Sequence, residues 1–251
     1  MMHKYGVQVG IYTQYFFKVI RDTPGVLIYT ICLPLVFLVL NVSSALFRPL
    51  SLTVYVNQVM PYIGWMIFSN CLMTAGTVAT LREQGYLKQY RTLVVSPAVF
   101  IVSQALVNLG IIIMTLLLVA VLSSVTFKLA FFPLLGRLWL TLLLVYLPVT
   151  CYSLPLIALA LRRKTVDTVM NALSLIVILG TFMVSNLLAV PASNPLLNLI
   201  SPIYLVNNVF AMISVAPVSH FIMTYLLSLV VLVAIGLLSY RHLKILPTEG
   251  L

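Results

Sequence analysis

The sequence predicts an all-helical membrane protein with six transmembrane helices, and its composition, hydropathy and placement of charge each support this. Hydrophobic residues make up 62% of the 251 residues, charged residues make up 7%, and the mean hydropathy is +1.15. Soluble domains are about 45–50% apolar and about 25% charged. The 14 basic and 4 acidic side chains could not cover the surface of a soluble protein of this size. Lipid must therefore be the solvent for most of the chain, which we expect to form a single domain over residues 1–251.

Residues 5–22 form the first expected element, a helix that lies on the membrane instead of crossing it. Its apolar and aromatic residues recur at helical spacing: Tyr5, Val9, Tyr12, Phe16 and Val19. Two basic residues, Lys18 and Arg21, lie near its end. This pattern predicts an amphipathic helix in the cytoplasmic interface of the bilayer. A polar tail with scattered aromatic residues is the alternative.

Six apolar runs follow, each long enough for the about 20 residues that a transmembrane helix needs. They lie at about 25–46, 54–80, 99–127, 138–161, 168–190 and 219–240. The second run is the most polar of the six. The fourth contains Pro148 and Pro155, which predict a kink or a break in that helix.

The connection between the fifth and sixth runs, residues 191–218, contains no charged residue and stays apolar. Such a segment is too hydrophobic to extend into water. We expect it to re-enter the outer leaflet as one or two short helices bounded by Pro195, Pro202 and Pro217, where protein covers the irregular backbone.

Basic residues gather on one side of this six-span arrangement. Eleven of the 14 fall on the side of the two termini: Lys4, Lys18, Arg21, Arg82, Lys88, Arg91, Arg162, Arg163, Lys164, Arg241 and Lys244. The other side has Arg48, Lys128 and Arg137. The positive-inside rule therefore places both termini in the cytoplasm, with the protein in a cell (inner) membrane. These basic residues do not form a face with interleaved aromatic residues, so no nucleic-acid partner is expected.

The predicted spans lack the residues that would support catalysis or ion coupling. All four acidic residues fall outside the predicted span cores: Asp22, Glu83, Asp167 and Glu249. Ion-coupled carriers keep an ionisable group at mid-membrane depth, so a secondary carrier is disfavoured. The sequence has no paired-carboxylate site and no HExxH, GxSxG or Walker A motif, so it is not expected to be an enzyme or to hydrolyse ATP on its own. Cys32, Cys71 and Cys151 lie in apolar runs without CxxC spacing and predict neither a disulfide nor a metal site.

Neutral and mostly polar residues form stripes along three of the predicted spans. They are Thr30, Phe37, Asn41 and Ser44 in the first span, Asn70, Thr74 and Thr77 in the second, and Asn171, Ser174, Thr181 and Ser185 in the fifth. One interpretation is ordinary helix packing, with hydrogen bonds worth about 0.6–2 kcal/mol each. The other is that these faces line a path for a bulky amphipathic cargo or form a dimer face. The pattern leaves both interpretations open.

The charged gap at residues 82–97 (REQGYLKQYRTLVVSP) resembles the cytoplasmic segment after the second span in permeases of the ABC-2 exporter family. The matching residues are Arg82, Glu83, Gly85, Leu87, Arg91, Ser96 and Pro97. The segment departs from the common family pattern at Tyr86 and Lys88. Residues 5–25 and 201–210 are similar to the family's elbow helix and re-entrant helices.

This resemblance implies a permease that works in pairs, either with a second copy of itself or with a sibling permease. Each permease would bind a cytoplasmic ABC ATPase subunit that holds ATP and Mg. Residues 81–97 would be the coupling helix on that subunit, with contacts from Arg82, Glu83, Gly85, Leu87, Lys88 and Arg91. A second contact could come from Arg162, Arg163 and Lys164, although these residues also serve as topology charges.

The function implied by this resemblance is ATP-driven export of an amphipathic or hydrophobic cargo from the cytoplasm or the inner leaflet. Such a cargo would be a drug, an antibiotic, an antimicrobial peptide or a lipid-linked molecule. The alternative is a membrane scaffold without ATP, or a lipid-binding enzyme embedded in the membrane.

Overall fold

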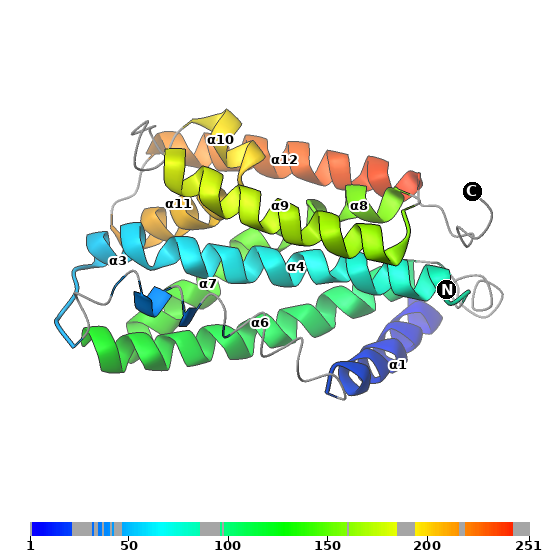
Figure 1. Cartoon of the computed structure of the whole chain (residues 1–251), viewed down its shortest axis with the longest axis horizontal. Coiled ribbons are helices and arrows are strands. Elements are labelled where there is room, and N and C mark those ends of the chain that lie inside the picture. The colour runs from blue at the N-terminus through cyan, green and yellow to red at the C-terminus, as the bar shows by residue number, and fades with distance from the viewer. Residues whose placement is uncertain are drawn as a thin grey trace.

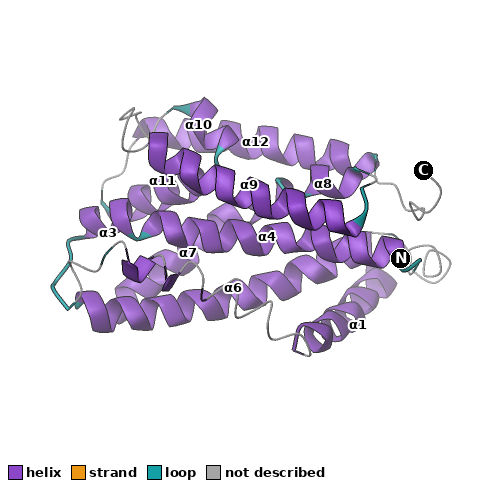
Figure 2. Ribbon diagram, in the orientation of Figure 1, coloured by secondary structure: helices purple, strands orange, loops and turns teal. Residues whose placement is uncertain are grey.

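The computed structural model is helical, and the part of the chain that it describes has no strand (Figure 2). The described residues are 2–21, 32, 35–36, 38–40, 42, 47–85, 96, 98–159, 161–184, 194–215 and 219–242. The helices are α1 (Met2–Arg21), α3 (Leu52–Gln58), α4 (Met60–Glu83), α6 (Ala98–Phe127), α7 (Phe131–Cys151), α8 (Leu154–Ala158), α9 (Arg163–Met183), α10 (Pro195–Ile200), α11 (Pro202–Ser214) and α12 (Ser219–Arg241).

Five helices among the described residues are long and apolar enough to cross a membrane, which is consistent with a multi-pass membrane protein. They are Met60–Glu83, Ala98–Phe127, Phe131–Ala158, Arg163–Met183 and Phe221–Arg241. These five correspond to the second to sixth predicted spans. The first predicted span, at about 25–46, lies mostly outside the described residues. Six of its positions are described as helical: Cys32, Leu35, Val36, Leu38, Val39 and Leu40.

Helix α4 runs through the middle of the bundle, with α9 on one side and α6 on the other (Figure 1). It has the lowest mean hydropathy of the five candidate spans and is also the most buried of them. These two properties agree, because a helix that is surrounded by protein can hold polar side chains that a lipid-facing helix could not. The polar character of the second predicted span therefore reflects its central place.

Two predicted spans begin earlier than the apolar pattern indicated. Helix α7 begins at Phe131 instead of 138, so Arg137 lies inside it, and α9 begins at Arg163 instead of 168. The candidate membrane-spanning helices therefore include charged residues near their ends: Arg82, Glu83, Arg137, Arg163, Lys164, Asp167 and Arg241. Each lies within about two turns of a helix end and not in the middle of a span, where a charge is most costly.

The fourth predicted span is interrupted, as its prolines predicted. Helix α7 ends at Cys151, and after Tyr152 and Ser153 the chain continues as α8 with Pro155 in its first turn. Pro155 has no backbone N–H to continue the ladder of hydrogen bonds, so a helix break at this point is expected. By contrast, Pro148 lies inside α7 without ending it.

Two short helices, α10 and α11, connect α9 to α12 and begin at Pro195 and Pro202, as predicted. The side chain of Asn194 accepts the Leu196 N–H at 3.0 Å, and that of Ser201 accepts the Tyr204 N–H at 3.1 Å, so both helices are capped. Every residue from Pro202 to Phe210 is buried. The remaining boundary proposed for this segment, Pro217, lies outside the described residues.

Helix α11 can approach α4 closely because residue 64 is a glycine. A Cβ atom at Gly64 would lie 3.1 Å from the Cγ2 atom of Ile203 and 3.3 Å from its backbone. The absence of a side chain at this position allows the two helices to pack in contact.

Candidate functional site

The end of α4 is the part of the described chain where the predicted coupling residues meet other helices. Arg82 and Glu83 are the last two residues of α4, and Gly85 follows with a φ of +72°. The left-handed region favours glycine, and the Gly85 N–H donates to the Arg82 carbonyl at 3.1 Å, which ends the helix. The two charged side chains are thus held on the last turn of a rigid helix.

The Arg82 side chain is directed into the protein and is only 1% exposed. Its Nη1 atom donates to the carbonyls of Ile157 at 3.3 Å and Leu159 at 3.0 Å, and its Nη2 atom donates to the carbonyl of Leu161. These carbonyls belong to the last turn of α8 and to the chain that follows it. The last carbonyls of a helix have no partner within the helix, and a cation is favourable beside them. Arg82 therefore stabilises the end of α8.

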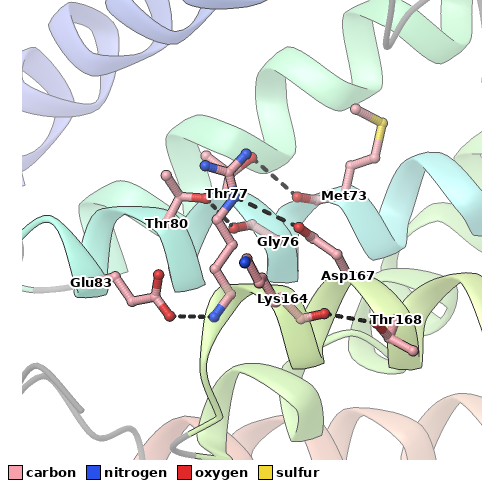
Figure 3. Close-up of polar contacts among 9 residues, drawn as sticks. Met73, Gly76, Thr77, Thr80, Glu83, Lys164, Asp167 and Thr168 are labelled. Carbon is pink, nitrogen blue, oxygen red and sulfur yellow. Dashed lines mark hydrogen bonds and ion pairs between the residues drawn. The ribbon is translucent and has the colours of Figure 1, made fainter. Parts of the chain in front are cut away.

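Glu83 points to the neighbouring helix and contacts the start of α9. Its Oε1 atom accepts a hydrogen bond from the backbone N–H of Arg163, the first residue of α9 (Figure 3). A carboxylate at a helix N-terminus is favourable, because the unpaired N–H groups there hold partial positive charge. We name the contacts of Arg82 and Glu83 with residues 157–163 the α4–α8–α9 junction.

Further from the junction, α4 and α9 are also in close contact at Gly76 of α4 (Figure 3). A Cβ atom at Gly76 would lie 2.8 Å from the Cε atom of Met170 and 3.3 Å from Oδ1 of Asp167. Asp167 also forms an i, i+4 ion pair with Arg163 at 3.6 Å. Both side chains of this pair are about half exposed, so its contribution to stability is about 0.5 kcal/mol or less.

The other end of the α4–α9 contact contains a small hydrogen-bonded cluster. The Oγ atom of Ser174 accepts from Nε1 of Trp65 at 2.6 Å and lies 2.9 Å from Oγ of Ser69. Together with Gly76 and the junction, this cluster joins α4 and α9 at three separate levels. We expect two helices joined in this way to move as one body.

Three of the six described stripe residues use their side chains for contacts between helices, namely Thr74, Ser174 and Thr181, and Asn70 uses its backbone carbonyl. The Nδ2 atom of Asn108 in α6 donates to the Asn70 carbonyl at 3.0 Å and to Oγ1 of Thr74 at 2.9 Å. Thr181 in α9 lies 2.7 Å from the Ser201 hydroxyl at the start of α11. These contacts agree with the packing interpretation of the stripes.

Two of the described stripe residues reach the surface of the chain. Asn171 is exposed, and Thr77 is half-buried and donates to the Met73 carbonyl of its own helix (Figure 3). They remain candidates for a cargo path or a dimer face. The other stripe residues lie outside the described part of the chain: Thr30, Phe37, Asn41, Ser44 and Ser185.

The structure places the second predicted contact, Arg162 to Lys164, directly beside Glu83, and all three basic residues are exposed. Leu87, Lys88 and Arg91 lie outside the described residues. The sequence did not predict that Arg82 binds carbonyl groups 75 to 79 residues further along the chain. Backbone carbonyls have no signature in a sequence, and only the predicted break in the fourth span indicated that unpaired carbonyls would be present.

Comparison of the chain with known protein families, with curated proteins and with solved structures finds no match. Within the described residues there is also no cluster of three or more His, Cys, Asp or Glu side chains that could hold a metal ion.

Proposed function

We propose that this chain is the membrane-spanning permease subunit of an ATP-driven exporter of the ABC-2 type. Its cargo would be amphipathic or hydrophobic: a drug, an antibiotic, an antimicrobial peptide or a lipid-linked molecule. ATP and Mg would bind to a separate cytoplasmic ATPase subunit. The observation that supports this proposal best is the α4–α8–α9 junction, because Arg82 and Glu83 are the first residues of the segment that resembles a coupling helix.

The junction supplies a physical route for coupling. A partner docked on residues 86–95 would move the end of α4. Because Glu83 binds the first N–H of α9 and Arg82 binds the end of α8, both of these helices would follow α4. ATP binding in the partner could then favour one of two arrangements of the bundle, as in other two-state membrane switches.

The proposal includes six spans with both termini in the cytoplasm. Helix α1 packs on α6 near Phe100 and Ser103, at the Ala98 end of α6. The Leu50 N–H donates to the carbonyl of Phe127, at the opposite end of α6. Helix α6 has 30 residues and is therefore about 45 Å long. The chain covers this distance between Arg21 and Leu50, which supports a span at about 25–46.

The proposal also includes a pair of permeases, formed with a second copy or a sibling, and re-entrant helices α10 and α11. The burial of α11 supports the proposal of re-entrant helices, because this uncharged segment packs against α4 and α7 instead of extending away from the bundle. Thr77 and Asn171 are the described residues that remain for a cargo path or a dimer face.

The test uses charge reversal in the proposed coupling segment. We expect Lys88→Glu with Arg91→Glu to leave the protein inserted in the membrane but to weaken its binding to the ATPase subunit by roughly tenfold or more, equivalent to about 1.4 kcal/mol. Co-purification of the ATPase, ATP turnover and export would each be measured. Arg48→Glu with Lys128→Glu is the matched control, because these two residues lie on the opposite predicted side.

Substitution of Arg82 and Glu83 is a poorer test of docking, since both side chains form internal contacts and a loss of export would not separate coupling from folding. Survival of ATPase binding, ATP turnover and export in the Lys88→Glu, Arg91→Glu protein would refute the coupling assignment. If no ATPase subunit co-purifies with the unmodified chain, a scaffold or a lipid-binding enzyme becomes the better hypothesis.

A further inference from the structure

Helix α1 is attached to the bundle through one face. The ring of Tyr12 lies edge-on to that of Phe100, with a centroid distance of 4.8 Å, and Phe16 is buried. The Ser103 hydroxyl donates to the Val9 carbonyl at 3.1 Å. Tyr12 and Phe16, two of the aromatic residues that the sequence pattern placed on one side of this helix, are therefore used for packing within the protein.

The opposite side of α1 is both apolar and basic. Val7, Ile11 and Tyr15 follow one another at i, i+4 spacing and are 50%, 59% and 51% exposed. Lys4 and Lys18 extend this row by about one turn at each end, and both are exposed. We name these five residues the open face of α1. The helix from Met2 to Arg21 contains no acidic residue that could neutralise them.

The contacts with α6 place α1 near the edge of a membrane. The hydrocarbon core of a bilayer is about 30 Å thick, and its headgroup layers extend the total to about 40–45 Å. Helix α6 has 30 residues, about 45 Å, so its first turns extend into a headgroup layer. Phe100 and Ser103, to which α1 binds, belong to these turns. A helix held at this depth lies among lipid headgroups.

Three exposed apolar side chains between two lysines fit the surface of an anionic bilayer. The apolar residues can enter the boundary between headgroups and acyl chains, and Tyr15 is of the type enriched at this depth. Each Lys or Arg near an anionic membrane surface contributes about 1 kcal/mol of attraction. At a zwitterionic surface the apolar side chains still favour binding, but the electrostatic attraction of the lysines is missing.

We propose that the open face of α1 binds anionic phospholipids of the leaflet on the side of the two termini. This inference does not depend on export or on an ATPase subunit. It concerns the chain alone and would hold for a scaffold with the same fold.

The first experiment measures lipid retention by the purified full-length chain. The protein is released from vesicles of equal parts phosphatidylglycerol and phosphatidylcholine, and the lipids that remain bound are identified by native mass spectrometry. We expect phosphatidylglycerol to be enriched. Lys4→Gln with Lys18→Gln should reduce this enrichment by roughly tenfold or more, because two favourable charges are lost.

The matched control is Arg48→Gln with Lys128→Gln, which also removes two exposed basic residues but at the opposite end of the bundle. It should keep the enrichment of the unmodified protein. Equal retention by the Lys4→Gln, Lys18→Gln protein and the unmodified protein would overturn the proposal, and so would an equal loss in both double variants.

The second experiment identifies the neighbour of the open face in cells. A photoreactive benzoylphenylalanine in place of Ile11 should form an adduct with the mass of a phospholipid. The same group in place of Phe16, which is buried, should react within the chain instead. If the Ile11 position cross-links to another protein, that protein is the occupant of the open face and the lipid proposal is wrong.

Discussion

At the scale of single residues, Arg82 and Glu83 illustrate how a short charged motif can act within a chain. Both follow a long apolar run, so hydropathy alone places them in a solvated gap. Arg82 instead donates to three carbonyls in the last turn of α8 and the chain that follows it, and Glu83 accepts from the first N–H of α9. The positive guanidinium thus lies beside the partial negative charge of backbone carbonyls, and the negative carboxylate lies beside the partial positive charge of a backbone N–H. The two residues connect three helices without an ion pair.

The planar guanidinium of Arg82 is essential for this arrangement, and lysine should not replace it. A lysine ammonium group is compact and cannot reach three carbonyls from one position. We expect Arg82→Lys to lower the free energy of unfolding by about 2–3 kcal/mol, since hydrogen bonds from a charged group are worth about 1.5–3 kcal/mol each. Reversible unfolding in mixed micelles would measure this loss.

The control for that substitution is Arg241→Lys in the last turn of α12, where the side chain is exposed. An exposed substitution of this kind should change stability by less than about 0.5 kcal/mol. Equal stability of the two variants would mean that the carbonyl contacts of Arg82 contribute nothing.

At the scale of elements, the sequence predicted helices well wherever the apolar pattern and the helix coincide. Helix α6 begins and ends within one residue of the predicted span, and the prolines marked the starts of α10 and α11. The starts of α7 and α9 were predicted too late, because the charged residues near the start of each helix look like a loop in a hydropathy pattern.

Which face a polar residue occupies was harder to predict than the helix that contains it. Asn108 and Asn171 are the same residue type, and both lie within candidate spans. Asn108 is buried and joins α6 to α4, whereas Asn171 is exposed on α9. The difference depends on which helices are neighbours, and a periodic pattern within one helix contains no information about its neighbours. For the same reason the junction of Arg82 and Glu83 required the structure.

Glycines provide a test of the contacts between helices in the structure. A Cβ atom at Gly236 in α12 would lie 2.9 Å from Sγ and 3.2 Å from Cβ of Cys151. Cys151 has a short side chain that cannot move aside, so α12 would have to shift away from α7. We expect Gly236→Ala to destabilise the protein by about 1–3 kcal/mol, measured by the same unfolding assay.

Gly110 in α6 is the matched control, because no atom lies within 4 Å of its added Cβ. Gly110→Ala should be neutral or stabilising by up to about 1 kcal/mol, as alanine is favoured over glycine in a helix. Cys151→Gly in the Gly236→Ala background should restore part of the lost stability by removing the side chain that the new methyl group meets. If the two glycine variants are equally stable, the close approach of α12 to α7 is contradicted.

At the scale of the whole molecule, the number of spans determines whether the two termini lie on the same side of the membrane. Helix α1 and the end of α12 lie at one end of the bundle, where Ser96 and Tyr240 lie within hydrogen-bond distance at 3.1 Å (Figure 1). Five of the described helices are candidate spans, which is an odd number. If both termini are on one side of the membrane, the run at about 25–46 must be a sixth span.

Labelling of single cysteines from outside the cell would decide the orientation and the number of spans together. In a chain with Cys32, Cys71 and Cys151 replaced by alanine, we expect a membrane-impermeant maleimide to label a cysteine at Lys128 in intact cells. Cysteines at Lys4 and His242 should react only after permeabilisation, because eleven of the 14 basic residues lie on their predicted side. All three of these positions are exposed in the folded chain, so burial would not prevent labelling. Labelling of only one terminus in intact cells would mean that the first apolar run does not cross the membrane. Labelling of both termini but not of position 128 would mean that the orientation is the reverse of the one that the positive-inside rule predicts.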